Sequence, residues 1–127
     1  MTHKILIVDD SKLARMAVAR ALNNLYPQWS RCEAATADEA LKCIGENAPD
    51  IVLLDFNMPG KDGLTLASEL RHSHPKINVA VVSANQQAEV VTRTREAGAT
   101  FLAKPLTEKA LGEYLKSIVE PRSSAAQ

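Results

Sequence analysis

The chain has 127 residues, a length that suits one domain with an ordinary core and is too short for two. Its 15 basic and 15 acidic side chains balance and are interspersed, so we exclude nucleic acid as a direct partner. The apolar runs are too short for a signal-peptide core or a membrane span, which predicts a cytoplasmic protein without membrane insertion.

Short apolar runs alternate with segments of helical periodicity along the chain. The first run, Ile5–Val8, is apolar throughout, as expected of a parallel strand covered on both faces. Ser11 is suited to cap the helix that follows, and Pro27 closes that segment. The next run, Cys32–Ala34, is short and has polar neighbours, which predicts a strand at the edge of a sheet.

The middle of the chain continues the same pattern. Thr36–Glu39 forms a capping box that begins the second helix, and Ile51–Leu54 is the clearest strand. Pro and Gly residues mark Phe56–Gly63 as a loop before a third helix that begins at Leu64. The remaining elements are expected as a strand at Val79–Val82, a helix at Glu89–Ala97, a strand at Thr100–Ala103 and a helix from Thr107 to Pro121.

Five strand–helix units without an internal linker predict one doubly wound α/β domain with a parallel sheet. We expect this domain to span residues 1–120. The short polar tail at 121–127 is expected to be disordered.

The cysteine and histidine residues give weaker signals. Cys32 and Cys43 have neither a CxxC spacing nor a nearby histidine, so we favour two buried thiols, with a disulfide between them as the alternative. His72 and His74 lie beside Pro75, where a helix should end. We expect exposed helix-terminal side chains there rather than metal ligands.

Polar side chains stand where four of the predicted strands end. Asp9 and Asp10 follow the first strand, Asp55 the third, Ser83 the fourth and Lys104 the fifth. The carboxyl ends of parallel strands share one edge, so these groups should meet in one crevice. Three crowded carboxylates require a cation, and a set of oxygen ligands selects Mg²⁺ or a similar ion. The chemistry indicated is phosphoryl transfer onto an aspartate.

These residues lie in motifs that resemble the receiver domains of the bacterial response-regulator family, the chemotaxis-regulator-like family, over residues 3–119. The resemblance implies a flavodoxin-like (βα)5 fold, with five parallel strands in the order 2-1-3-4-5. It rests on Ile-Val-Asp-Asp-Ser at 7–11, Leu-Leu-Asp-Phe-Asn-Met-Pro-Gly at 53–60, Asp-Gly at 62–63, Ser-Ala at 83–84 and Lys-Pro at 104–105.

The resemblance also implies roles for the residues at this edge. Asp55 would be the phosphoacceptor. Asp10 would bind Mg²⁺ directly and Asp9 largely through water, with Asp55 and the backbone carbonyl of Asn57 as the other protein ligands; Mn²⁺ is an alternative ion. Lys104 would pair with Asp55 before the reaction and with a phosphoryl oxygen after it.

Further positions match those that family members use to transmit and end the signal. Ser83 and Phe101 would form a switch that alters the surface of the fourth helix, fifth strand and fifth helix. Phe101 stands where tyrosine is also common, so this switch would rest on packing alone. Asn57 and Asn85 would tune dephosphorylation, and the Lys104–Pro105 peptide bond would be cis.

The function expected is that of a single-domain response regulator in a two-component phosphorelay, a signalling switch rather than an enzyme. It would receive its phosphoryl group from a histidine kinase or a histidine phosphotransfer protein. It would then regulate an unidentified partner in trans, as a monomer or a weak phosphorylation-dependent dimer.

Three other classes compete with this interpretation. A phosphohydrolase of the haloacid-dehalogenase type also uses a strand-end aspartate, but it needs a second aspartate where this chain has Asn57. A Rossmann-type nucleotide binder would need a glycine-rich turn after the first strand, where this chain has Asp-Asp-Ser. An interaction module that is never phosphorylated would have no use for the intact Asp55 and Lys104.

Overall fold

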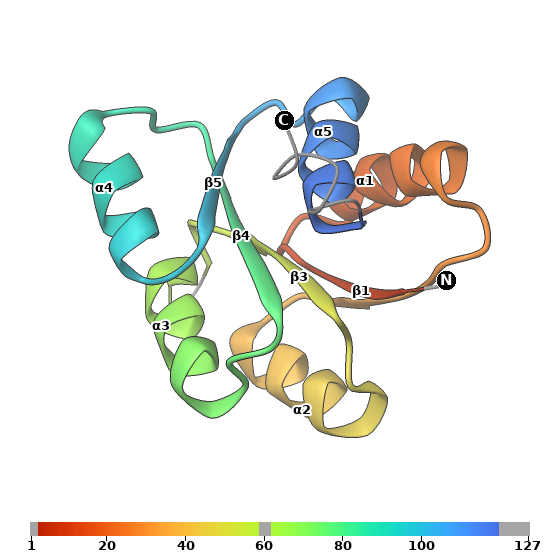
Figure 1. The fold of residues 1–127 in the computed structure, drawn as a ribbon, viewed down its shortest axis with the longest axis horizontal. Coiled ribbons are helices and arrows are strands. Elements are labelled where there is room, and N and C mark those ends of the chain that lie inside the picture. The colour runs from red at the N-terminus through yellow and green to blue at the C-terminus, as the bar shows by residue number, and fades with distance from the viewer. Residues whose placement is uncertain (1–2, 59–61, 120–127) are drawn as a thin grey trace.

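The computed structural model describes residues 3–58 and 62–119, along which strands and helices alternate (Figure 1). The predicted tail at 121–127 and part of the predicted loop, 59–61, lie outside the described residues. The strands are β1 Lys4–Val8, β2 Ser30–Ala34, β3 Ile51–Asp55, β4 Asn78–Ser83 and β5 Thr100–Ala103. The helices are α1 Lys12–Leu25, α2 Ala37–Asn47, α3 Gly63–Ser73, α4 Ala88–Glu96 and α5 Glu108–Val119.

The five strands form one parallel sheet in the order β2-β1-β3-β4-β5, which confirms the predicted doubly wound topology. Helices α1 and α5 cover one face, and α2, α3 and α4 cover the other (Figure 1). The chain runs from β1 outward to β2 and then returns past β1 to β3. This reversal creates the crevice in which doubly wound proteins place their functional groups.

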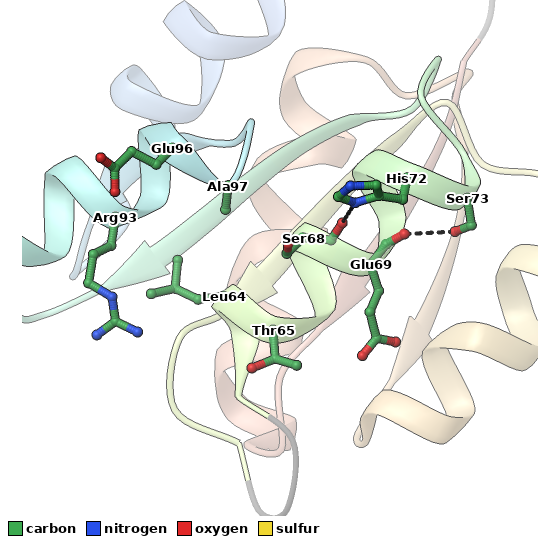
Figure 2. A pocket seen from close by; sticks show the side chains of 9 residues that line it. All are labelled: Leu64, Thr65, Ser68, Glu69, His72, Ser73, Arg93, Glu96 and Ala97. Carbon is green, nitrogen blue, oxygen red and sulfur yellow. Dashed lines mark hydrogen bonds between the residues drawn. The ribbon is translucent and has the colours of Figure 1, made fainter.

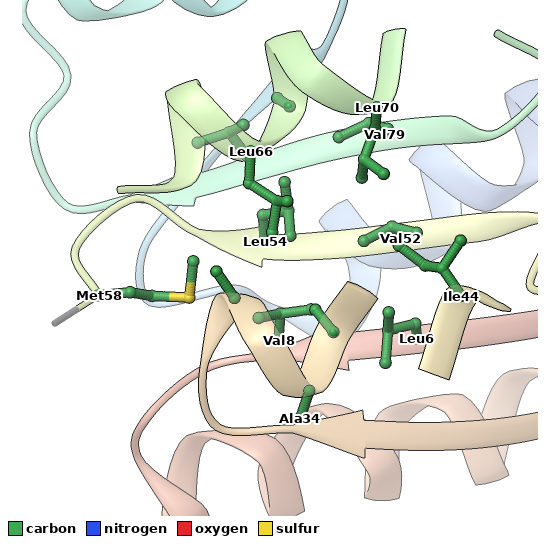
Figure 3. Close-up of a cluster of buried hydrophobic side chains, with 14 of the residues drawn as sticks. Leu6, Val8, Ala34, Ile44, Val52, Leu54, Met58, Leu66, Leu70 and Val79 are labelled. Carbon is green, nitrogen blue, oxygen red and sulfur yellow. The ribbon is translucent and has the colours of Figure 1, made fainter. Parts of the chain in front are cut away.

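Alternate residues of the strands pack into two apolar clusters, one on each face of the sheet. In the cluster of Figure 3, Leu6, Val52 and Leu54 pack with Ile44 of α2 and Leu70 of α3. The cluster on the other face contains Ile5, Ile7, Leu53, Leu111 and Leu115. Because both faces are covered, the inner strands are apolar except at their ends, as the sequence indicated.

The two edge strands differ from the inner ones. On β2, Arg31 and Glu33 are exposed to solvent, which agrees with the predicted edge position. The opposite edge, β5, has only 4 residues.

Side chains accept hydrogen bonds from backbone N–H groups at the starts of several helices, although α4 has no such cap. The side chains of Ser11 and Thr36 accept hydrogen bonds in the first turns of α1 and α2, as predicted. Glu39 reaches back to the N–H group of Ala35, completing the second cap. Helix α3 begins at Gly63 rather than after it, because Asp62 caps it.

The cysteines differ from the sequence expectation. Cys32 of β2 and Cys43 of α2 are joined by a disulfide rather than lying as two separate thiols. Ala34 of β2 and Ile44 of α2 belong to the cluster of Figure 3, and Cys43 lies in the same cluster with Cys32 packed against it. Sequence spacing alone does not show this packing. The prediction of two separate thiols is therefore wrong, and the alternative, a disulfide, is correct.

Gly63 is the point where α3 touches the end of β3. A Cβ atom at this position would lie 2.5 Å from the backbone oxygen of Asp55 and 3.1 Å from the Cα atom of Phe56. Backbone atoms cannot move aside as a flexible side chain can. The close approach therefore requires glycine.

We expect Gly63→Ala to lower the free energy of unfolding by about 1–3 kcal/mol, because the added methyl group overpacks a backbone contact. The matched control is Gly45→Ala in α2, where a Cβ atom meets nothing within 4 Å. That change should raise the free energy of unfolding by roughly 0.5–1 kcal/mol through helix propensity. Chemical denaturation measures both, and equal effects of the two changes would contradict the steric argument.

Candidate functional site

The carboxyl edge of the sheet brings together the polar residues that follow its strands. Asp9 and Asp10 come directly after β1, Asp55 ends β3 and Ser83 ends β4. Lys104 comes directly after β5, and its N–H group donates a 3.0 Å hydrogen bond to the carbonyl of Ser83. The parallel register thus gathers residues that are far apart in the sequence.

A cluster of three carboxylates and one ammonium group forms the centre of the site. The carboxylates of Asp9, Asp10 and Asp55 each place an oxygen within 4.8 Å of the others. Lys104 Nζ donates a hydrogen bond of 2.8 Å to Asp55 Oδ1 and lies 3.7 Å from Asp9 Oδ2. Asp9 and Asp55 are buried, whereas Asp10 is exposed.

Asp9 is held through its backbone as well as its side chain. Its N–H group donates to the carbonyl of Ala34 at 3.0 Å, and its Oδ1 accepts from the N–H group of Ser11 at 2.9 Å. Arg15 Nη1 donates to the carbonyl of Asp9 at 2.6 Å, while Arg15 Nε pairs with Glu33 at 3.0 Å. Asp9 is therefore fixed from both β2 and α1.

Sequence reasoning missed Arg15 and Glu33 as supports of the site. In the sequence, Arg15 is only one of the 15 basic side chains interspersed with acidic ones. The position of Arg15 could have indicated this role. Arg15 lies one helical turn after the Ser11 cap, and side chains at that position of a helix point back toward its start, here toward the end of β1.

Burial and neighbouring charges together raise the pKa values of two groups in the cluster, Asp9 and Lys104. Burial is the main cause that raises the pKa of Asp9, and the negative charge of Asp55 adds to it, although the hydrogen bond from Ser11 opposes the change. Burial alone would lower the pKa of Lys104, but its hydrogen bond to Asp55 and the nearby carboxylate charges outweigh this and raise it. Lys104 therefore stays charged at neutral pH.

The donor set suits a small hard cation. All three clustered side chains offer carboxylate oxygens, and no histidine or cysteine joins them in the described residues. Oxygen ligands of this kind select Mg²⁺ or Mn²⁺ over softer metals. The residues present thus fit the predicted ion.

The remaining predicted residues surround this centre at different depths. The side chain of Ser83 is fully buried, and its Oγ accepts a 3.0 Å hydrogen bond from the N–H group of Asn85. Asn57 and Asn85 are exposed at the mouth of the site. Phe101, three residues before Lys104 on β5, is half-buried and lines a small cavity of about 260 Å³ together with Val91.

An apolar cavity of about 460 Å³ adjoins the carboxylates. Ala14 and Val18 of α1 line it together with Pro105 and Leu106, which follow β5. The Lys104–Pro105 peptide bond is cis, the isomer that the family resemblance implied. A reacting group at Asp55 would thus have a polar edge on one side and apolar walls on the other.

A second hollow lies between α3 and α4, away from the carboxylates (Figure 2). Its lining includes Ser68 and His72 of α3 and Arg93 of α4. The Nδ1 atom of His72 lies 2.9 Å from the carbonyl of Ser68, and the Nδ1 atom of His74 lies 2.8 Å from Ser73 Oγ. The two histidines are exposed at the end of α3, and neither belongs to the metal-type cluster found in the described residues.

The fold and this site together define a class of signalling domain, and comparison with known proteins identifies the family. Residues 5–116 match the family model described as the response regulator receiver domain. The chain therefore belongs to the response regulator receiver family.

Individual relatives agree with this assignment. The chain is 35% identical over 119 residues to a glycerol metabolism activator of Pseudomonas putida, covering 92% of this chain and 54% of that protein. It is 29% identical to sporulation initiation phosphotransferase F of Bacillus subtilis, covering 98% and 99%. The chain spans about half the length of several of the curated relatives it matches.

Solved structures show the same fold. The receiver domain of NtrX from Brucella abortus is 32% identical and superimposes with a TM-score of 0.82, covering 91% of this chain and 98% of that one. Chemotaxis protein CheY4 of Vibrio cholerae is 25% identical and superimposes with a TM-score of 0.82, covering 91% of this chain and 98% of that one. Among the helices of the described residues, none has the length and apolar character needed to cross a membrane.

We expect Asp9→Asn to raise the free energy of unfolding at neutral pH in metal-free buffer. The folded pKa of Asp9 lies above its ordinary value of 3.8. The unfolded chain therefore binds fewer protons between these two values, and stability falls as pH rises through that window. Asparagine removes this loss and can still accept the hydrogen bond from Ser11.

Denaturation from about pH 4 to pH 7 with a chelator present measures this effect. Asp10→Asn is the matched control, because the side chain of Asp10 is exposed and should change stability less. An Asp9→Asn variant that is less stable than the wild type at neutral pH would contradict the argument.

Proposed function

We propose that this receiver domain accepts a phosphoryl group on Asp55 and passes the signal on by changing its surface. The observation that carries the proposal is the buried Asp55 carboxylate, which lies in a trio of carboxylates and is hydrogen-bonded to Lys104 at 2.8 Å. A nucleophile, a cation site and a mobile positive charge are the parts that phosphoryl transfer needs.

The proposed reaction uses the groups already in place. A carboxylate oxygen of Asp55 attacks the phosphorus of a phosphohistidine, the nitrogen–phosphorus bond breaks, and the histidine ring nitrogen leaves with the bonding electron pair. When bound, Mg²⁺ supplies charge neutralisation to the phosphoryl oxygens. Asp9 and Asp10 would hold it with Asp55 and the Asn57 carbonyl. The ammonium of Lys104 moves from the carboxylate to a phosphoryl oxygen.

The donor is proposed to be a histidine kinase or a histidine phosphotransfer protein. Leu13 and Met16 of α1 are exposed, with 78% and 47% of their surface accessible, and apolar residues of α1 also wall the cavity beside Asp55. Exposed apolar side chains beside a reactive group favour a protein donor over a small molecule. The name of the B. subtilis relative, a phosphotransferase of sporulation initiation, supports a place in a phosphorelay.

The output is proposed to run through Ser83 and Phe101 to the surface formed by α4, β5 and α5. The buried hydroxyl of Ser83 can donate to a phosphoryl oxygen on Asp55. Its movement would leave space for the ring of Phe101, which is half-buried. Since phenylalanine has no hydroxyl group, packing alone would separate the two states. A partner bound in trans would read this surface.

Asn57 and Asn85 are proposed to set the lifetime of the phosphoryl group. Both lie exposed at the mouth of the site, where an amide can orient or obstruct an attacking water molecule. Neither amide can act as a strong base, which also argues against the phosphohydrolase alternative. We therefore propose that these two amides set the rate at which the switch loses its phosphoryl group. We also propose that the domain works in the cytoplasm as a monomer or a weak phosphorylation-dependent dimer.

We expect one phosphoryl group to be added when the protein is incubated with a small acyl phosphate and Mg²⁺, and none to be added to Asp55→Asn. Intact-mass measurement checks this, because the acyl phosphate bypasses the unidentified kinase. Asp38→Asn is the matched control, since Asp38 is an exposed aspartate in the first turn of α2 and should leave the adduct unchanged.

No adduct with intact donor would overturn the proposal in favour of an interaction module that is never phosphorylated. Steady hydrolysis of the donor, dependent on Asp55 and without a lasting adduct, would favour the phosphohydrolase class instead.

We expect Mg²⁺ to raise the free energy of unfolding, because it binds the folded carboxylate cluster and not the unfolded chain. The gain is about 2.7 kcal/mol when the ion is present at 100 times its dissociation constant. Asp10→Asn should lose most of this gain and Asp38→Asn should keep it. Denaturation with Mg²⁺ or with a chelator measures the difference, and equal gains in both variants would exclude the cluster as the binding site.

A further inference from the structure

The disulfide between Cys32 and Cys43 ties β2 to α2 close to the functional site. These are the only two cysteines among the 127 residues, so no other thiol competes for either partner. The two cysteines are 11 positions apart in the sequence, and the segment between them contains the turn that leads from the end of β2 to the Thr36 cap of α2. The bridge therefore controls how freely this turn can move.

The residues that follow Cys32 hold the backbone of Asp9. The carbonyl of Ala34 accepts the N–H group of Asp9 at 3.0 Å. Glu33 pairs at 3.0 Å with Arg15, which in turn donates to the carbonyl of Asp9 at 2.6 Å. Cys32 is therefore one residue from Glu33 and two residues from Ala34, the two residues of β2 through which Asp9 is held.

We propose that Cys32 and Cys43 form a reversible thiol–disulfide site whose oxidation state sets how firmly the β2–α2 segment holds Asp9. The proposal adds a redox input to the domain and does not depend on phosphorylation of Asp55. In a reducing compartment the pair is mostly thiol, and disulfides that form there are usually transient and redox-sensing.

The oxidant that fits is a small-molecule disulfide such as oxidised glutathione. Cys32 is half-buried and Cys43 is 8% exposed, so the thiolate of Cys32 is the one that meets the oxidant. It attacks one sulfur of the small disulfide, breaks that bond and releases one small thiol, which takes up a proton.

The thiolate of Cys43 then attacks the sulfur of Cys32 and displaces the second small thiol. The two protein thiols are oxidised by two electrons, and the small disulfide is reduced to two thiols. Reaction with excess small thiol reverses both steps. In the disulfide form the side-chain amide of Asn47 donates to Cys43 Sγ at 3.4 Å, and the same amide is within reach of this sulfur when the bridge opens.

The first measurement follows the thiols of the folded wild-type protein in buffers of reduced and oxidised glutathione. Acid quenching, alkylation and intact-mass analysis count the free thiols. We expect both cysteines to be alkylated in the most reducing buffer, both to be protected in the most oxidising one, and the change to reverse on return. Cys43→Ala should yield only a glutathione adduct on Cys32.

The second measurement compares hydrogen exchange in the oxidised and reduced wild-type protein. We expect the amide of Asp9 and the amides of residues 30–47 to exchange more slowly in the oxidised form, by roughly tenfold or more, because closing a loop of this length removes open states. Amides of α5 serve as the internal control. The Cys32→Ala, Cys43→Ala double variant should show no response to the buffer.

Three results would overturn the proposal. Cysteines that stay fully alkylatable in the folded protein under all buffers would exclude the disulfide, and a bridge that persists in excess reduced glutathione would make it purely structural. Thiols that interconvert without a change at Asp9 would exclude the coupling. Neither measurement needs a phosphoryl donor, so failure of the redox site is distinguishable from failure of the proposed function.

Discussion

The hydrogen-bonded ion pair between Lys104 and Asp55 is the interaction on which the site depends. Three carboxylates each place an oxygen within 4.8 Å of the others, and like charges at this spacing repel one another. Lys104 reaches this cluster because β5 pairs with β4, and β4 in turn pairs with β3. The order of the strands is thus what brings the ammonium group of Lys104 to the buried carboxylate of Asp55.

The parts of the fold that were predictable are those encoded in short stretches of sequence. The apolar runs before Asp9, Asp55 and Ser83 specify covered strands, because only such strands tolerate apolar residues on both faces. The caps at Ser11 and Thr36 are equally local, since a side chain there bonds to a backbone group three residues on. Once these elements were placed, the rule for parallel sheets brought the polar strand ends together.

Other features depended on contacts between distant segments. The pairing of Cys32 with Cys43 depends on how α2 lies over β2, which spacing alone does not report. The bond from Arg15 to the Asp9 carbonyl uses a backbone acceptor that has no signature in sequence. The depth of Ser83 compared with Asn57 likewise follows from packing around the crevice. Local chemistry thus predicted which polar residues meet at the edge of the sheet better than it predicted the contacts that support them.

The edges of the sheet have a consequence for the behaviour of the chain at high concentration. An open strand edge offers unpaired backbone groups to other chains and can seed aggregates. Here β2 displays Arg31 and Glu33 to solvent, and β5 offers a row of only 4 residues. Charge protects the first edge and shortness protects the second. Both features disfavour pairing between the strand edges of neighbouring copies when the domain is concentrated.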